Sequence, residues 1–186
     1  MRSIFISFLL FAGVAQASPV ALEINSGYTL ATYTGAAAVN AGNVDIRSTL
    51  FAVREQQVGN IQSWYLFFDP SGNQSVQATL DFGGKILDVI TTSAGLASSL
   101  GTYGTDVDGD GVFNDYSSRA AMGLESGDRV QWALGGRTLA IDWNASDPGD
   151  HVRVLVQLVP EPATAALALL GMGLGIAGAT RRRKTR

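Results

Sequence analysis

Apolar and polar residues alternate along most of the central part of the chain, and this period of two predicts β-strands. The clearest case is the segment 151–158, in which Val152, Val154, Val156 and Leu158 share one face. Six further segments show the same alternation: residues 44–53, 62–68, 74–82, 86–91, 129–134 and 138–143. The pattern therefore predicts about seven short strands, each with one apolar face.

Turn-forming residues separate the predicted strands. Residues 69–73 (DPSGN), 83–84 (GG) and 147–150 (DPGD) are typical of turns, and Gly135-Gly136 between two alternating runs predicts a tight hairpin. Long helical periods are absent, and only residues 92–100 indicate a helical turn or short helix. We therefore expect an all-β domain, an antiparallel β-sandwich of jelly-roll-like type.

Five aromatic residues of these segments have two interpretations. Aromatic side chains on sandwich strands usually lie in the core, but exposed rings can stack on sugars. The core interpretation is the ordinary one, and it applies to Trp64, Phe67, Phe82, Trp132 and Trp143.

The amino terminus has the pattern of an export signal. Arg2 precedes an apolar run over residues 4–14, and Ala15 and Ala17 occupy the small-residue positions of a cleavage site. The run is too short to span a bilayer, which takes about 20 residues. We expect residues 1–17 to be a signal peptide, recognised by the Sec translocon and removed by signal peptidase.

The carboxyl terminus combines an apolar run with a basic end. Residues 163–179 carry no charge and, as a helix, reach roughly 25 Å, slightly less than a bilayer core. A basic cluster follows, which we interpret as a membrane stop on the cytoplasmic side rather than a nucleic-acid patch: Arg181, Arg182, Arg183 and Lys184. The run thus predicts one transmembrane helix, with the domain 18–158 outside the cytoplasm.

The tripeptide before this run completes a recognisable order. Pro160-Glu161-Pro162, the short Gly/Ala/Leu-rich span and the terminal arginines resemble the PEP-CTERM sorting signal of bacterial surface proteins. The resemblance covers residues 159–186 and implies processing by an exosortase near the tripeptide. It further implies an inner-membrane anchored precursor that passes to the cell envelope or to an exopolysaccharide matrix.

Charge and cysteine content narrow the possible functions. All sixteen acidic residues lie between positions 18 and 162, together with seven of the thirteen basic ones, so this part has a net charge of −9. An acidic exterior argues against nucleic acid as a partner. Since the chain has no cysteine, disulfides, thiolate zinc sites and cysteine nucleophiles are excluded.

One aspartate-rich segment has the chemistry of a calcium loop. Its aspartates at loop positions 1, 3 and 5, followed by glycine, match the first half of an EF-hand-type loop, whereas Ser117 replaces the closing glutamate. The candidate ligands of a structural Ca²⁺ are Asp106, Asp108, Asp110, Val112 (through its carbonyl), Asn114 and Asp115. The alternative is a solvated acidic loop without an ion.

No pattern of an enzyme is present. The one histidine, His151, flanks a turn at a strand start, where a surface position is ordinary, and no G-x-S-x-G elbow occurs. We therefore expect a non-catalytic envelope or matrix protein with a structural or interaction role linked to exopolysaccharide or biofilm. The alternative is a calcium-dependent carbohydrate-binding module.

Overall fold

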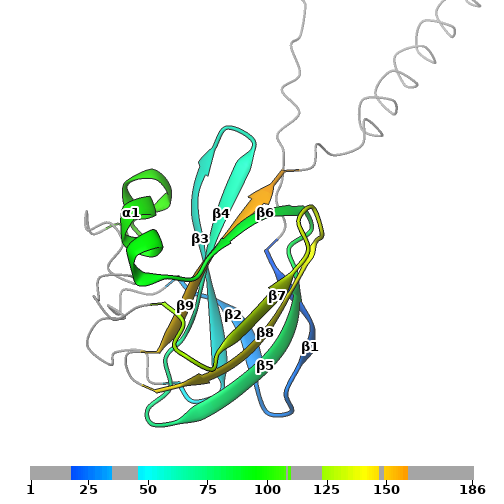
Figure 1. Cartoon of the computed structure of the whole chain (residues 1–186), viewed down its shortest axis with the longest axis vertical. Helices are drawn as coiled ribbons and strands as arrows, with labels where there is room; N and C mark the ends of the chain where they lie inside the picture. Colours follow the sequence, from blue (N-terminus) through cyan, green and yellow to red (C-terminus); the bar gives the residue numbers. More distant parts are fainter. Residues whose placement is uncertain (1–17, 35–45, 108, 110–122, 147–148, 159–186) are drawn as a thin grey trace, which may run out of the picture. The chain divides into compact units, whose positions relative to one another are not determined.

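The computed structural model describes residues 18–34, 46–107, 109, 123–146 and 149–158 of the 186-residue chain (Figure 1). These residues fall within one compact unit, Gln16–Val159. The predicted signal peptide, the sorting segment 159–186 and most of the aspartate-rich loop lie outside them. In the described part of the chain, no helix is long and apolar enough to cross a bilayer. The transmembrane segment predicted at residues 163–179 lies beyond this part.

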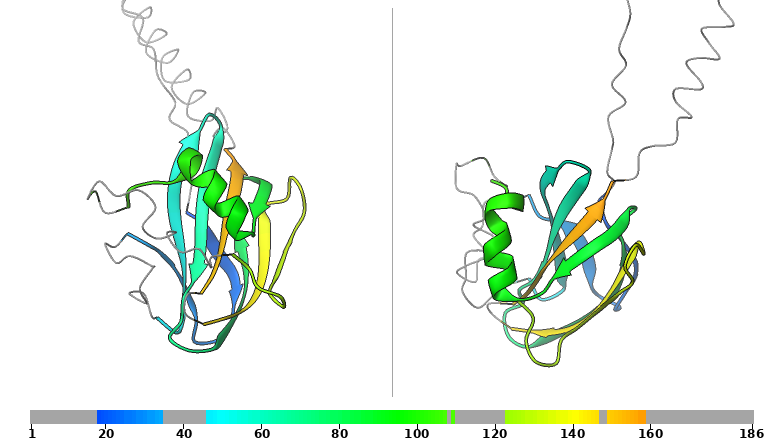
Figure 2. Two further views of the ribbon diagram at one scale, coloured as in Figure 1. Left: turned by 60° about the vertical axis from the view of Figure 1, so that its left-hand side comes forward. Right: turned by 45° about the horizontal axis from the view of Figure 1, so that its top comes forward.

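The described strands form two sheets that face each other (Figures 1 and 2). The four-stranded sheet has the order β1 (Val20–Ile24), β5 (Gln74–Asp81), β8 (Thr138–Ala145) and β7 (Arg129–Trp132). The five-stranded sheet has the order β2 (Thr29–Thr32), β3 (Thr49–Val58), β4 (Ile61–Phe68), β9 (Asp150–Gln157) and β6 (Lys85–Ile90). The helix α1 (Ser93–Tyr103) follows β6. The all-β prediction is confirmed, and so is the short helix.

Pairing is antiparallel throughout these sheets except between β2 and β3, which run parallel. Parallel neighbours need a long crossover, and the connection from Thr32 to Thr49 is long enough to supply it. The prediction of a purely antiparallel sandwich is therefore wrong at this pair of strands. The jelly-roll comparison stays a prediction.

Several strand boundaries differ from the sequence prediction, most of all in the first part of the body. The strand expected at residues 44–53 is β3, which begins at Thr49 and continues to Val58, and the short strands β1 and β2 were not predicted. The hairpin at Gly135-Gly136 is confirmed, since it joins the antiparallel pair β7 and β8. Gly135 has φ 76°, a conformation that favours glycine, and Gly136 N–H donates to the Ala133 carbonyl at 2.8 Å.

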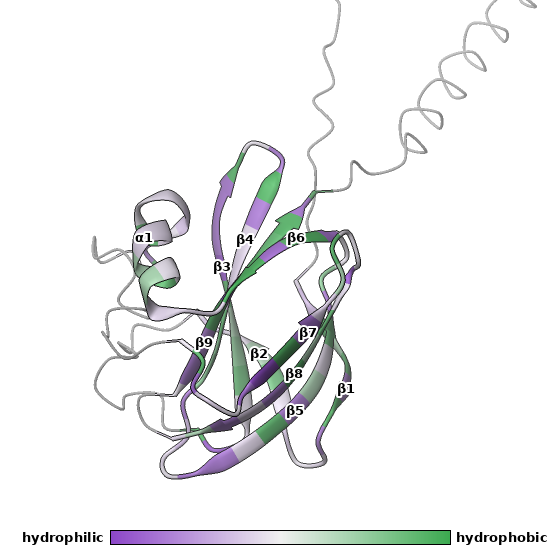
Figure 3. Ribbon diagram, viewed as in Figure 1, coloured by the Kyte–Doolittle hydropathy of each residue, from purple (hydrophilic) through white to green (hydrophobic). Residues whose placement is uncertain are grey.

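The main core lies between the two sheets, as the alternation predicts. Val152, Val154 and Val156 project from β9 into this core, where Trp64, Phe82 and Trp143 are also buried. Trp132 is half-buried against the same core. Figure 3 shows the resulting alternation of hydrophobic and hydrophilic residues along β5, β7 and β8.

A second apolar cluster lies on the outer side of the five-stranded sheet. It joins side chains of β3 and β4 to Leu96 of α1, so the helix covers this face (Figure 2). Thr92 caps the helix, since its Oγ1 accepts from the Gly95 N–H at 3.2 Å. The members of the cluster are Tyr33, Phe51, Val53, Tyr65, Phe67 and Leu96.

Candidate functional site

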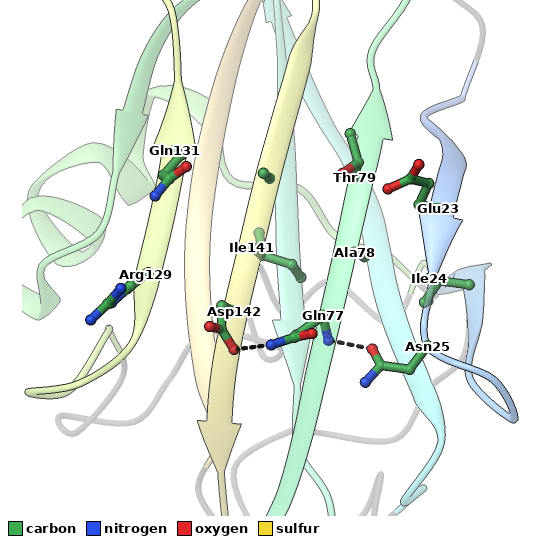
Figure 4. Close-up of a pocket in the computed structure, with 11 residues that line it drawn as sticks. Glu23, Ile24, Asn25, Gln77, Ala78, Thr79, Arg129, Gln131, Ile141 and Asp142 are labelled. Atoms are coloured by element: carbon green, nitrogen blue, oxygen red, sulfur yellow. Dashed lines mark hydrogen bonds between the residues drawn. The ribbon is translucent and has the colours of Figure 1, made fainter.

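The outer face of the four-stranded sheet carries a shallow groove of about 520 Å³ (Figure 4). Among the described elements, α1 covers the other sheet and none packs over this one. The groove is lined by polar side chains from β1, β5, β7 and β8. It is therefore a candidate interaction site of the described body.

Cross-strand pairing explains why the sheet is hollow here. Thr79 and Ala140 are paired across β5 and β8, and their short side chains leave space above the middle of the sheet. The next row along the strands holds longer side chains, because Gln77 pairs with Asp142 and Asp142 pairs with Arg129. Thr79 and Ala140 are also flanked in their own row by the longer Glu23 and Gln131, so the short pair forms the floor of the groove.

Hydrogen bonds fix part of this polar surface. The Gln77 side-chain amide donates to Asp142 Oδ1 at 3.1 Å, and the Gln77 backbone N–H donates to Asn25 Oδ1 (Figure 4). Glu23, Arg129 and Gln131 project beside them. Amides, carboxylates and a guanidinium provide both donors and acceptors, which suits a ligand rich in hydroxyl groups. No aromatic residue lines the groove, so binding there would rest on hydrogen bonds rather than stacking.

The covered face of the other sheet contains a buried ion pair. Arg153 of β9 donates from Nε to Glu55 Oε2 at 2.6 Å and from Nη2 to Oε1 at 2.7 Å, and both side chains are fully buried. Arg153 Nη1 also donates to the Leu96 carbonyl of α1 at 3.0 Å and to Ser99 Oγ. A two-point guanidinium–carboxylate contact of this kind fixes geometry, and here it attaches the helix to the sheet.

Further groups complete this network. Ser63 Oγ donates to Glu55 Oε2 at 2.5 Å, and the Arg153 guanidinium lies 5.3 Å from the centre of the Tyr65 ring. Burial, reinforced by the charge of Glu55, raises the pKa of the Tyr65 hydroxyl far above its ordinary value. No local sequence pattern predicts this pair, because Glu55 and Arg153 are 98 residues apart.

His151 is buried, so the sequence-based prediction of a surface position is wrong. Its ring stacks on Phe67 with 5.8 Å between centroids and an angle of 17°, and it lies 5.6 Å from Tyr65. The reason is that β9 is an interior strand of its sheet, between β4 and β6, whose outer face carries the second apolar cluster. The turn before His151 therefore did not indicate exposure.

Two carboxyl groups meet where the sheets join. Asp150 begins β9 with only 2% of its surface exposed, and it lies beside Asp128. Asp128 accepts the Asn144 N–H at 2.9 Å and the Glu125 N–H at 3.0 Å. The pKa of the Asp150 carboxyl is raised to about 7, first by burial and then by the negative charges of Asp128 and Glu125.

The aspartate-rich loop is described only at its start. Asp106 Oδ1 accepts the Gly109 N–H at 2.7 Å, which closes a tight turn. The other predicted ligands, Asp108, Asp110, Val112, Asn114 and Asp115, lie outside the described residues. Within the described ranges, no group of three or more His, Asp or Glu residues is placed to hold a metal ion. The calcium site stays a prediction.

Fold and surface together define an all-β sandwich protein with one covered outer face and one open polar face. Comparison of the sequence with known protein families found a match in the tail. Residues 158–184 match the PEP-CTERM protein-sorting motif. The chain thus carries a PEP-CTERM sorting motif at its tail, which points to an exported, membrane-processed protein. No curated protein and no solved structure matches the chain.

Proposed function

We propose that this protein is a non-catalytic component of the cell envelope or extracellular matrix, whose body interacts with exopolysaccharide and contributes to biofilm architecture. The sorting motif supports export and processing at the membrane. The observation that carries the interaction role is the open groove, with polar side chains from four strands converging on about 520 Å³. Its donors and acceptors suit sugar hydroxyls.

The proposed route uses both ends of the chain. The Sec translocon exports the precursor, and signal peptidase cuts after Ala17. Residues 163–179 then hold the precursor in the inner membrane, with the basic cluster at residues 181–184 as the stop. Exosortase recognises Pro160-Glu161-Pro162 and releases the body to the envelope or matrix.

A non-catalytic role agrees with the surroundings of His151 and Tyr65, two of the groups that could do acid–base chemistry. His151 is fully buried between aromatic rings, and Tyr65 is fully buried beside an ion pair. A general base has to lie within hydrogen-bond reach of a substrate, and neither side chain has access to one. The groove residues are suited to holding a ligand.

Binding to polysaccharide tests the proposal. The full-length protein in detergent is titrated with polysaccharide secreted by the producing bacterium, and the heat of binding is measured. Calorimetry is preferable to tryptophan fluorescence, because Trp64 and Trp143 are buried. We expect saturable binding that weakens about tenfold, or about 1.4 kcal/mol, in the double variant Gln77→Ala/Asp142→Ala.

The matched control is Asp88→Ala, which removes an exposed carboxylate from β6 of the opposite sheet. We expect this variant to bind like the wild type. Absence of any heat up to millimolar sugar, or equal loss in the control and the groove variant, would contradict the groove as the binding site.

The second candidate is a calcium-dependent carbohydrate-binding module. It is favoured by the alternate aspartates Asp106, Asp108 and Asp110 before Gly111, the spacing with which calcium loops of this type begin. In this case the same titration would require calcium, and chelator would abolish binding. Binding that is equal with chelator and with calcium would exclude this candidate and leave the first.

A further inference from the structure

Both ends of the described body lie at one pole of the sandwich (Figures 1 and 2). At the start of the body, Val20 of β1 pairs with Asp81, the last residue of β5. At its end, Gln157 of β9 pairs with Lys85, the first residue of β6. Since β5 and β6 are joined by the turn at residues 82–84, the first and last strands leave the body on the same side.

Two more turns belong to this pole. The Leu158 N–H donates to the Asn60 carbonyl of the β3–β4 turn at 2.8 Å. Ile86 exchanges hydrogen bonds with Gly135 and Gly136 of the β7–β8 turn at 2.9 and 2.7 Å. We use the term exit pole for the following set: Val20, residues 58–60, 81–85 and 134–137, and Leu158.

The length of the chain beyond the exit pole limits its distance from a membrane. Leu158 is 5% exposed and hydrogen-bonded, so the body extends to this residue. The apolar run of the sorting segment begins at Ala163, five residues later. Five residues span at most about 18 Å when fully extended. The headgroup layer itself is roughly 5–8 Å thick on each side. A body tethered by this run therefore keeps its exit pole at the headgroups or within about 10 Å of them.

The surface chemistry of the exit pole fits this position. Val20, Val58 and Leu134 are exposed there by 54, 42 and 79%, and they are three of the five large exposed apolar residues of the described body. Lys85 is exposed, and Arg137 is exposed by 59%. The acid of the exit pole is Asp81, which pairs with Arg137 at 3.0 Å. Apolar tips with cations beside them are typical of surfaces that rest on anionic lipid.

The opposite pole carries more acidic than basic side chains, with Arg47 beside Ser71 as a cation there. The buried or half-buried carboxyl groups Asp69, Asp150 and Asp128 lie at the far ends of β4, β9 and β8, with Glu125 beside them. An acidic body would be repelled by an anionic bilayer in most orientations. The uneven distribution leaves the exit pole as the face with the least repulsion.

We propose that the exit pole is a membrane-docking surface that rests on anionic lipid headgroups while the sorting segment holds the precursor. The inference rests on the proposed export and tethering of the chain. In this orientation the acidic pole points away from the membrane. Because docking ends when the tail is cut, the surface acts only in the precursor.

Depth-dependent fluorescence quenching tests the proposal, and the absence of native cysteine makes labelling simple. The full chain carries a dye either at Asn60→Cys, on the exit pole, or at Asn73→Cys, in the turn after β4 at the other pole. The eight residues of β4 separate the two sites by roughly 25 Å. The labelled proteins are reconstituted into vesicles of phosphatidylcholine and phosphatidylglycerol in equal amounts, with a headgroup-attached nitroxide as quencher.

We expect several-fold stronger quenching at Asn60→Cys than at Asn73→Cys. A second variant, Val58→Ser/Lys85→Glu/Leu134→Ser, keeps the tether but alters the surface, and we expect it to lower the quenching at Asn60→Cys at least twofold. Unchanged quenching in this variant would overturn the role of the surface and leave chain length as the cause.

Flotation separates failure of this inference from failure of the proposed function. If the chain floats with the vesicles and both labels are quenched equally, docking is wrong while tethering stands. If the chain does not float with vesicles at all, the tethered precursor is wrong, and docking is overturned with it.

Discussion

The two outer faces of this sandwich follow the same alternation of residues and have opposite surroundings. On the four-stranded sheet, the outward residues of β5 and β8, such as Gln77 and Asp142, are exposed and form the groove. On the five-stranded sheet, the outward residues Glu55 and Arg153 are polar as well, yet both are fully buried beneath α1. A polar side chain on the outer face of a sheet is therefore not necessarily exposed to solvent in this molecule.

The difference arises from the helix α1, which lies in the connection between β6 and β7. The helix α1 contributes one buried side chain, Leu96, and carbonyl and hydroxyl acceptors for Arg153. A weakly apolar helix of this kind covers a sheet by satisfying its polar groups as much as by apolar contact. Removal of a charge from the covered face should therefore lower the free energy of unfolding strongly. The same change on the open face should have little effect on it.

The largest expected effect is the loss of one partner of the buried pair. Glu55→Ala leaves the Arg153 guanidinium buried without its carboxylate, and we expect a loss of about 3–5 kcal/mol of unfolding free energy. For a body of this size the melting temperature should fall by roughly 10 °C. Thermal and urea unfolding measure both quantities.

A double replacement and a surface pair serve as controls for this experiment. Glu55→Leu/Arg153→Met removes both charges and should recover most of the lost stability. Arg137→Ala, which breaks the exposed pair with Asp81, should cost no more than about 1 kcal/mol. Equal destabilisation by Glu55→Ala and Arg137→Ala would show that the two faces do not differ as described.

The next effect concerns Asp150, at the junction of the two sheets. Because its folded-state pKa of about 7 lies above the ordinary value of 3.8, folding takes up a proton, and its contribution to stability is lost as pH rises from about 4 to 7. Asp150→Asn cannot ionise and can donate to Asp128. We expect it to be more stable than the wild type by on the order of 2 kcal/mol at pH 8.

The pH profile of urea unfolding checks this prediction. The advantage of Asp150→Asn should shrink below pH 7 and vanish near pH 3, below the ordinary pKa of 3.8, where the wild-type carboxyl is mostly protonated in both states. The control Asp88→Asn, at an exposed position, should follow the wild-type profile. A constant difference between Asp150→Asn and the wild type from pH 4 to 8 would exclude titration of Asp150 as its cause.

Part of this architecture was accessible from sequence and part was not. Alternation over residues 151–158 identified the strand and its inner face, because the period of two depends only on local geometry. The burial of His151 and Arg153 depends on which strands flank β9 and on what covers it. Both depend on contacts between segments that are far apart in the sequence. The tail motif, in contrast, was predictable because its three parts are contiguous.

The candidate site was harder to predict than the fold. The groove needs the register of β1, β5, β7 and β8, which places Thr79 beside Ala140. Neither residue type carries a chemical signal, since short side chains are ordinary in strands. The aspartate-rich loop gave the strongest chemical signal, and its prediction still awaits a test.

Calcium binding would act on the side of the molecule that α1 covers, since Asp106 follows the helix closely. At a calcium concentration ten times the dissociation constant, we expect about 1.4 kcal/mol of added stability and a small rise in melting temperature. The variant Asp108→Asn/Asp110→Asn should lose this rise, whereas Gln77→Ala should keep it. An identical melting temperature with calcium and with chelator would dismiss the site.

The smallest expected effect is a matched enlargement on the two outer faces. Ala140→Leu fills the open groove and should change the unfolding free energy by no more than about 0.5 kcal/mol. Ser63→Leu inserts the same side chain at the buried position that donates to Glu55, and should cost at least about 1–3 kcal/mol. Comparable losses at both positions, measured by urea unfolding, would remove the distinction between the faces.

β9 is the last strand to be synthesised, yet it lies between β4 and β6 in the interior of the five-stranded sheet. Until it arrives, β6 has no neighbour in that sheet, and Glu55 has no guanidinium to neutralise it. The sandwich cannot close around a nascent chain that stops short of residue 157. In the export route proposed above, this late central strand would keep the body open while its earlier part crosses the membrane, and would couple completion of the fold to the emergence of the sorting segment.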